Sequence, residues 1–167
     1  MSENTEISKI NTEKSIYAQK AKQRFLDGCN CAQAVLLAFS DLYDIDEKTA
    51  LRLSSSFGGG IGRLREVCGC VSGMCMAAGL LYGYDDLNDH DAKSEHYKRI
   101  QELAEKFRNE TGSIICRELL GLDDKQESHI PEKRTSEYYK KRPCAELTGI
   151  AAAILEEYIK VTSEKNF

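Results

Sequence analysis

Glycine and cysteine are concentrated in residues 57–75, a stretch that interrupts a chain with otherwise helical patterning. The stretch, FGGGIGRLREVCGCVSGMC, holds six of the twelve glycines and three of the seven cysteines. Glycine lets the backbone turn tightly and approach other groups closely. Cysteine supplies soft nucleophiles and soft metal ligands. We therefore expect a tight turn with a chemical site beside it.

The rest of the chain predicts a single all-α domain over residues 1–167. Its 167 residues suit one domain with a real core. Hydrophobic residues make up 41% and charged residues 30%, as in ordinary globular proteins. Alternating β-branched residues are almost absent, whereas apolar residues recur at helical spacing. We expect a bundle of six or seven helices with one buried central helix.

The predicted helices cover residues 6–27, 31–43, 46–56, 68–82, 90–109, 114–120 and 144–161. The apolar segment 68–82 is the predicted central helix. It contains Gly69, Gly73 and Gly79, and each lowers helix propensity by about 1 kcal/mol relative to alanine. Such glycines are acceptable where two helices must approach closely. The polar and charged residues 122–142 are predicted to form a long loop or a partly ordered excursion.

Charge and hydropathy bear on three questions: whether the protein binds nucleic acid, whether it enters a membrane and where in the cell it lies. The net charge of −4 argues against general nucleic-acid binding. No apolar run approaches the ~18 residues needed to span a bilayer, so we expect no membrane insertion. The N-terminal residues lack the regions of a signal peptide, which predicts a cytoplasmic protein. A redox partner protein and a homo-oligomer are both compatible with the sequence.

Four cysteines fall in the first turns of predicted helices. In a reducing cytosol, cysteines indicate metal binding, redox chemistry or packing rather than a disulfide framework. Those at helix starts are Cys31 after Asn30, Cys68 after the glycine loop, Cys116 after Ser113 and Cys144 after Pro143. The unpaired N–H groups and partial positive charge of a helix N-terminus favour the thiolate. We expect these helix ends to converge on one site.

Several segments together resemble the C_GCAxxG_C_C family of small bacterial and archaeal proteins, which carries a redox-active label. They are GCNCAQAV at 28–35, FGGGIG at 57–62, EVCGCVSG at 66–73, CRELLG at 116–121, and Cys144. The resemblance covers about residues 20–160. It places the four shared family cysteines at Cys31, Cys68, Cys116 and Cys144. Cys70 stands where the family has a small residue, and Cys29 and Cys75 lie outside the shared set.

Three functions follow for the four matched cysteines. In the first, they bind a [2Fe–2S] cluster or a zinc ion, for electron transfer or sensing. A related domain is joined to haem-carrying segments in some redox proteins, which favours the cluster. In the second, they are catalytic thiols that cycle between dithiol and disulfide without metal. In the third, they are inert packing residues of a helical interaction module. An enzyme would be an oxidoreductase or an electron-transfer component.

Other residues near these cysteines have two interpretations each. The backbone of Gly58, Gly59, Gly60 and Gly62 can wrap a cluster or an anion, or form only a tight turn. Cys70 is a candidate cofactor-binding or resolving thiol, or a buried packing residue. Arg63 and Arg65 can offset thiolate charge, although solvated arginines are more common. The run YYKKR at 138–142 is either a docking patch or, by default, a solvated face. No histidine is assigned a role.

Overall fold

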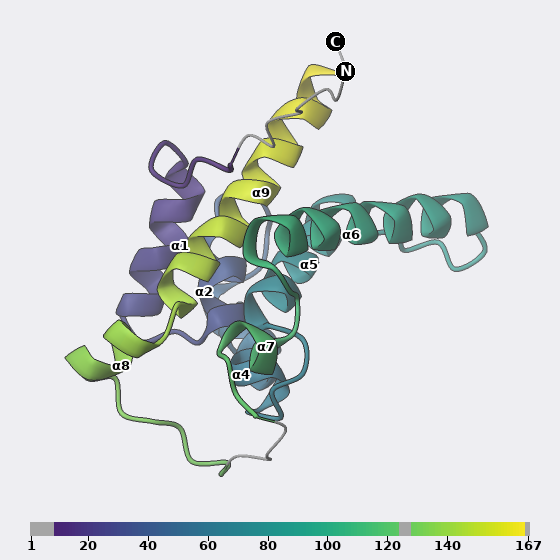
Figure 1. Cartoon of the computed structure of the whole chain (residues 1–167). Coiled ribbons are helices and arrows are strands. Elements are labelled where there is room, and N and C mark those ends of the chain that lie inside the picture. The colour runs from purple at the N-terminus through teal and green to yellow at the C-terminus, as the bar shows by residue number, and fades with distance from the viewer. Residues whose placement is uncertain (1–8, 124–127, 166–167) are drawn as a thin grey trace, which may run out of the picture.

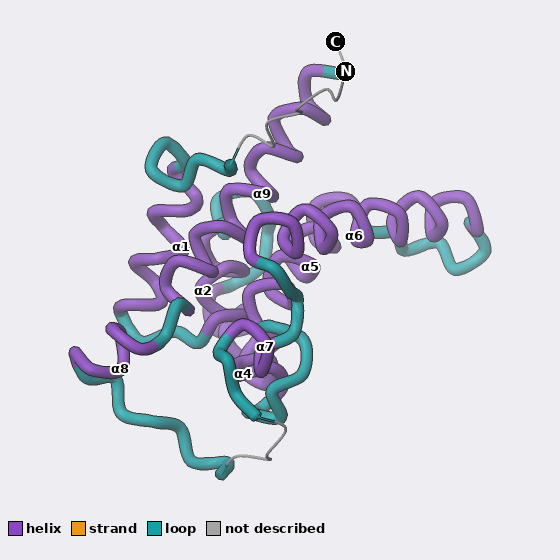
Figure 2. Tube along the Cα trace, in the orientation of Figure 1, coloured by secondary structure: helices purple, strands orange, loops and turns teal. Residues whose placement is uncertain are grey.

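The computed structural model describes residues 9–123 and 128–165 (Figure 1). Its elements are α1 (Ile16–Leu26), α2 (Cys31–Ala38), α3 (Glu47–Ser54), the 3₁₀ turn η1 (Ser55–Phe57), α4 (Gly58–Ile61), α5 (Gly69–Tyr82), α6 (His90–Thr111), α7 (Cys116–Leu119), α8 (Ser136–Lys141) and α9 (Cys144–Glu164). No strand occurs among the described residues, apart from an isolated bridge between Val67 and Ile115 (Figure 2). The predicted all-α fold class is confirmed.

Helices α1, α2, α5 and α9 form the body of the molecule. α1 packs against both α9 and α2, and α2 packs against α5. The core between them includes Phe25, Leu36, Met74 and Leu155, none of which is more than 1% exposed. Burial of each such side chain stabilises the fold by about 1.5–3 kcal/mol. α6 projects away from this body (Figure 1), and its buried residues Leu103 and Phe107 lie toward its C-terminal end.

The central helix α5 touches α2 through glycines, as predicted. A Cβ added at Gly73 would lie 2.6 Å from the carbonyl oxygen of Ala32. One added at Gly69 would lie 3.0 Å from the Cβ of Cys31. Real Cβ atoms do not approach this closely, so glycine at 69 and 73 sets the distance between the two helices. Gly79 has no such neighbour within 4 Å and plays no part in that contact.

Each of the seven predicted helical segments contains a helix, but two boundaries were wrong. The predicted segment 6–27 begins partly outside the described residues, and its helix starts only at Ile16. The Ser15 side chain caps it by accepting a hydrogen bond from the Ala18 N–H. The segment predicted to end at Tyr43 ends at Ala38. The Tyr43 hydroxyl donates to the Leu36 carbonyl and so folds the following turn back onto the helix.

Within residues 122–142, predicted as a long loop or partly ordered excursion, one short helix forms, α8. Residues 124–127 lie outside the described part of the chain. The Thr135 side chain accepts a hydrogen bond from the Tyr138 N–H and caps α8. Only Arg142 separates α8 from Pro143, which occupies the N-cap position of α9. Within the described residues, no helix is both long and apolar enough to cross a membrane.

Candidate functional site

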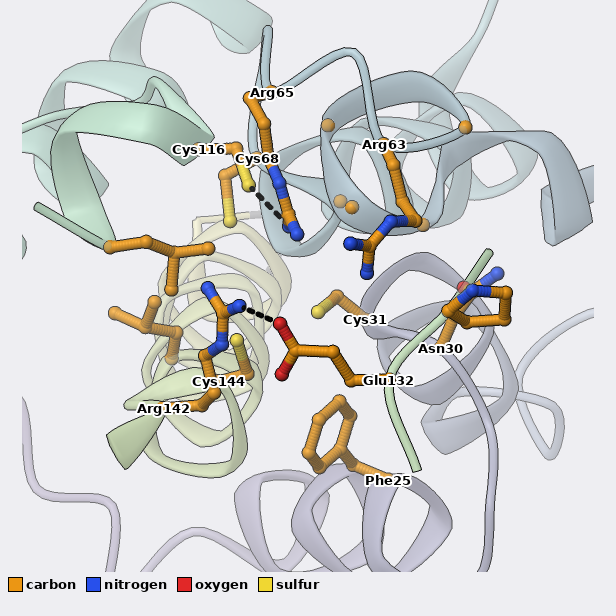
Figure 3. Close-up of a pocket in the computed structure, with 18 of the residues that line it drawn as sticks. Phe25, Asn30, Cys31, Arg63, Arg65, Cys68, Cys116, Glu132, Arg142 and Cys144 are labelled. Atoms are coloured by element: carbon orange, nitrogen blue, oxygen red, sulfur yellow. Dashed lines mark hydrogen bonds and ion pairs between the residues drawn. The ribbon is translucent and has the colours of Figure 1, made fainter. Parts of the chain in front are cut away.

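The structure brings Cys31, Cys68, Cys116 and Cys144 to one cavity of about 500 Å³ (Figure 3). Cys31, Cys116 and Cys144 are the first residues of α2, α7 and α9, and Cys68 directly precedes α5. All four side chains are buried, with at most 9% exposed. Four helix starts, from distant parts of the sequence, therefore face the same space with their cysteines.

Gly58, Gly59, Gly60 and Gly62 all line this cavity. Gly59, Gly60 and Gly62 have left-handed backbones, with φ between 55° and 67°. At Gly60 space is also short, because a Cβ would lie 2.7 Å from both the Cys116 Cβ and the Glu66 nitrogen. Glycine at this position therefore lets the loop pack directly against Cys116.

Three residues that are not glycine share the left-handed conformation. They are Ile61 at φ 65°, Arg63 at φ 68° and Arg65 at φ 61°. The left-handed conformation costs roughly 1–2 kcal/mol for each such residue. Residues held this way cluster at functional sites, where surrounding contacts compensate for the strain. The guanidinium groups of Arg63 and Arg65 extend into the cavity (Figure 3).

Backbone hydrogen bonds between two crossing segments hold Cys68 and Cys116. The Cys68 N–H donates to the Ile114 carbonyl at 2.8 Å, and the Cys116 N–H donates to the Glu66 carbonyl at 2.6 Å. The Arg117 N–H donates to the Arg65 carbonyl at 3.2 Å. This is the only two-way backbone pairing of extended segments among the described residues. It fixes one wall of the cavity.

The surroundings of Cys31 lower its pKa, unlike those of Cys116 and Cys144. Hydrogen bonds from the Cys144 thiol, and next from the Cys70 thiol, hold the pKa of Cys31 well below its ordinary value. Burial opposes this effect, while the positive charge of Arg134 and a backbone N–H at the start of α2 add to it. Cys31 is therefore the thiol most ready to ionise.

The pKa values of Cys144, Cys70 and Cys116 shift in the opposite direction to that of Cys31. The hydrogen bond to Cys31, followed by burial, raises the pKa of Cys144. Burial, followed by the hydrogen bond to Cys31, raises the pKa of Cys70 well above its usual range. Burial also raises the pKa of Cys116, although Arg65 opposes this with a guanidinium nitrogen 3.7 Å from its sulfur. These shifts favour ionisation of Cys31 ahead of Cys70, Cys116 and Cys144.

The remaining cysteines do not line the described part of the cavity. Cys70 is fully buried, and it reaches the site only through its contacts with Cys31 and Cys68. Cys29 and Cys75 are half-buried and pack against the core. Burial raises the pKa of Cys75 to about 11, as expected for an unreactive thiol.

Five residues that were not predicted to lie beside the cysteines complete the cavity wall: His129, Glu132, Arg134, Tyr138 and Arg142. The default interpretation of residues 138–142 as a solvated face was wrong for Arg142, whose side chain is only 12% exposed. Arg142 lies 2.7 Å from a Glu132 carboxylate oxygen. The one available signal was its position two residues before Cys144.

Arg134 attaches this wall to the end of α1. Its guanidinium donates to the carbonyl oxygens of Phe25 at 3.0 Å and Cys29 at 3.1 Å. It also lies over the Phe25 ring, 4.1 Å from the centroid. These contacts keep a positive charge close to Cys31.

The described side chains do not form a ready-made metal site. Across residues 9–123 and 128–165, no group of three or more cysteine, histidine, aspartate or glutamate side chains is arranged to hold a metal ion. The [2Fe–2S] cluster and the zinc ion therefore stay predictions.

A family model, rather than an individual known protein, places the chain in one family. No curated protein and no solved structure matches it. A family model with the description "Putative redox-active protein (C_GCAxxG_C_C)" matches residues 29–158, which is most of the chain and includes the four cavity cysteines. The chain therefore belongs to the C_GCAxxG_C_C family.

Proposed function

We propose that the cavity is a thiol redox site in which Cys31 is the nucleophile and Cys144 is the resolving thiol. One observation carries the proposal: Cys31 and Cys144 begin two different helices and line the same cavity, which is large enough for a small molecule. The neighbouring Cys144 thiol is also the largest influence that lowers the pKa of Cys31, the sulfur that attacks. The redox-active description of the family agrees with this chemistry.

The reaction is an exchange with a disulfide from solution. The Cys31 thiolate attacks one sulfur of that disulfide, forms a mixed disulfide and releases the other half as a thiolate. Cys144 then attacks the Cys31 sulfur and releases the second half, and its proton passes to one of the two released thiolates. Cys31 and Cys144 together lose two electrons, and the external disulfide gains them.

Neighbouring groups prepare Cys31 for this attack. The Cys70 thiol donates to Cys31 from the buried side, away from the cavity, so it stabilises the thiolate without facing the substrate. The backbone at the start of α2 and the Arg134 charge act in the same direction. We assign Cys70 a positioning role, in place of the cofactor-binding role expected from the sequence.

A second candidate function is a [2Fe–2S] cluster or zinc ion bound by Cys31, Cys68, Cys116 and Cys144. It is favoured by the presence of all four at one cavity, beside Arg65 and at helix starts that offset thiolate charge. A cluster would supply one-electron transfer, and zinc would hold the thiols in a fixed arrangement. It ranks second because the side chains must first move to form a group able to hold metal.

Anaerobic purification tests both candidates on the same sample. For the thiol site, we expect colourless protein without stoichiometric iron, zinc or sulfide, and reversible oxidation to one Cys31–Cys144 disulfide, identified by peptide mass spectrometry. Cys31→Ser and Cys144→Ser should each prevent that disulfide, and Cys75→Ser is the matched control that should not.

Other outcomes contradict the proposal in distinct ways. Visible absorption bands with stoichiometric iron and acid-labile sulfide would establish the cluster instead. Metal-free protein whose thiols resist both oxidant and alkylation would leave the inert helical module.

A further inference from the structure

A segment distant from the cysteines in sequence places a carboxylate inside the cavity. We call residues 128–135 the strap. Arg63 holds its first residue, because the Arg63 Nε donates to the Ser128 carbonyl at 2.8 Å. Arg134 holds its other end through the contacts with α1 described above. Between these points Glu132 extends into the cavity, toward Arg142 and close to Cys31 and Cys144 (Figure 3).

The two members of the Glu132–Arg142 ion pair differ sharply in exposure. The Arg142 side chain is 12% exposed, whereas the Glu132 side chain is 47% exposed. Arg142 also directly precedes the start of α9, two residues from Cys144. A guanidinium held beside reactive thiols therefore has, as its partner, a carboxylate that solvent already reaches.

This difference makes the carboxylate the replaceable member of the pair. A largely buried guanidinium that loses its partner is left with an uncompensated charge, but exchange of one carboxylate for another keeps the charge and the hydrogen bonds. The exposed side chain of Glu132 can rotate out of the cavity toward solvent. The less exposed side chain of Arg142 remains in the cavity wall. A small molecule that carries its own carboxylate can thus take the place of Glu132, and one without a carboxylate cannot.

The electrostatic surroundings favour the same class of ligand. The described wall includes four arginines, Arg63, Arg65, Arg134 and Arg142, with Glu132 as its one acidic residue. The chain as a whole has a net charge of −4, so this concentration of positive charge is local. Arginine pairs with carboxylates in planar, bidentate geometry, which gives orientation as well as attraction.

We propose that the cavity takes a low-molecular-weight disulfide bearing a carboxylate, that Arg142 binds that carboxylate, and that Glu132 occupies its place until the substrate displaces it. This substrate class rests on the thiol redox function proposed above. The Arg142 contact would orient the ligand, so that its disulfide faces the Cys31 sulfur rather than the mouth of the cavity.

The test compares three alkyl disulfides of similar size and different charge: 3,3′-dithiodipropionate (anionic), bis(2-hydroxyethyl) disulfide (neutral) and cystamine (cationic). The measurement is the rate constant for Cys31 modification, divided by the rate of each disulfide with free 2-mercaptoethanol. We expect the anion to react fastest. Arg142→Gln should lower the anion rate about tenfold and leave the neutral rate within about twofold.

The strap variant gives the opposite change. Glu132→Gln should raise the anion rate several-fold and leave the neutral rate unchanged, since the competing charge is gone. Glu137→Gln is the matched control, because Glu137 pairs with the exposed Lys140 on α8, outside the cavity wall. Thermal unfolding of each variant establishes that it is folded.

A redox-inert dicarboxylate separates binding from chemistry. Adipate should slow the alkylation of Cys31 by iodoacetamide in the natural protein, but not in Arg142→Gln. Equal rates for all three disulfides, unchanged by either variant, would overturn the substrate class and leave the thiol function standing. Fastest reaction with cystamine, slowed by Glu132→Gln, would instead make Glu132 a site for cations. Failure of all three disulfides to modify Cys31 would refute the redox function itself.

Discussion

Two sides of the cavity present cysteines by different structural means. On the helical side, Cys31 and Cys144 begin α2 and α9, which are regular helices packed in the body of the molecule. On the loop side, Cys68 and Cys116 are held by backbone hydrogen bonds between two irregular segments. The helical side has the low-pKa thiol and its donor. The loop side has the strained backbone.

The difference indicates a division of labour between the two sides. The pKa of Cys31 is lowered chiefly by the Cys144 and Cys70 thiols, with a smaller contribution from a backbone N–H at the start of α2, and this needs no unusual backbone. The loop side adds shape instead, because its left-handed residues curve the chain around the cavity. We therefore expect variants of the helical side to change reactivity first, and variants of the loop side to change stability first.

The largest effect on reactivity should come from the helical side. In Cys31→Ser, the fastest remaining thiol should react at pH 7 about 100-fold more slowly than Cys31 does in the natural protein, because the thiolate is the nucleophile. Cys116→Ser, on the loop side, should change that rate only a few-fold. Iodoacetamide labelling followed by peptide mass spectrometry measures each cysteine separately. Comparable losses in the two variants would abolish the distinction between the sides.

The largest effect on stability should come from the loop side. Gly60→Ala should lower the free energy of unfolding by about 3 kcal/mol, because it adds left-handed strain and a clash with Cys116 and Glu66. Gly112→Ala is the matched control: its φ is also positive, at 94°, but no atom lies within 4 Å of the added Cβ. Strain alone should cost about 1 kcal/mol there.

Urea denaturation monitored by circular dichroism gives both free energies. Equal losses at Gly60 and Gly112 would mean that backbone strain, and not the contact with Cys116, requires glycine in the loop.

The pH dependence of Cys31 should sharpen the comparison further. Cys144→Ala removes the strongest hydrogen bond that lowers the pKa of Cys31, so that pKa should rise. Labelling of Cys31 near pH 7 should slow by about tenfold, and labelling well above pH 9 should be unchanged, because the thiolate is then formed in both proteins. Cys75→Ala, which removes a thiol with a pKa of about 11, should leave the profile as it was.

Stability should follow the same titration. Because folding lowers the pKa of Cys31, its thiolate contributes stability that is fully present above the unfolded pKa. That contribution is lost as the pH falls through the folded pKa. Cys144→Ala should reduce this pH-dependent part of the unfolding free energy. An unchanged labelling profile would show that Cys144 does not control the ionisation of Cys31.

The smallest predicted effect concerns helix α5, which packs against α2 on the helical side of the cavity. Gly79→Ala should stabilise the protein by up to about 1 kcal/mol, because alanine favours the helix and no atom lies within 4 Å. Gly73→Ala should destabilise it, since the added Cβ would meet the Ala32 carbonyl. Thermal unfolding measures both. Stabilisation by both variants would mean that the two helices can separate without cost.

The sequence was sufficient for the helical side of the cavity because its signals are local. Asn30 caps α2 through a capping box with Gln33, and Pro143 precedes Cys144 at the start of α9. These patterns predict helix starts wherever they occur. The resemblance to the family then grouped the four cysteines, which composition alone does not do.

The loop side and the strap depend on contacts that no local pattern encodes. Ile61, Arg63 and Arg65 take left-handed backbones although their side chains disfavour them. Backbone hydrogen bonds within the loop hold it, and it is tied to distant segments where the Arg117 N–H donates to the Arg65 carbonyl and the Arg63 Nε donates to the Ser128 carbonyl. Glu132 and Arg142 are polar residues in a polar segment, so their approach to the cysteines follows only from the tertiary fold. The low pKa of Cys31 likewise needs Cys144 as its neighbour.

The position of α9 in the chain has a consequence for synthesis. Cys31 is made early, but its hydrogen-bond donor Cys144 begins the helix that is made last among those described here. Domains fold as units while the chain emerges from the ribosome. Until α9 docks against α1 and α2, Cys31 lacks the largest of the influences that lower its pKa. Under the proposed thiol function, Cys31 would therefore reach its full reactivity only once the helical body is assembled.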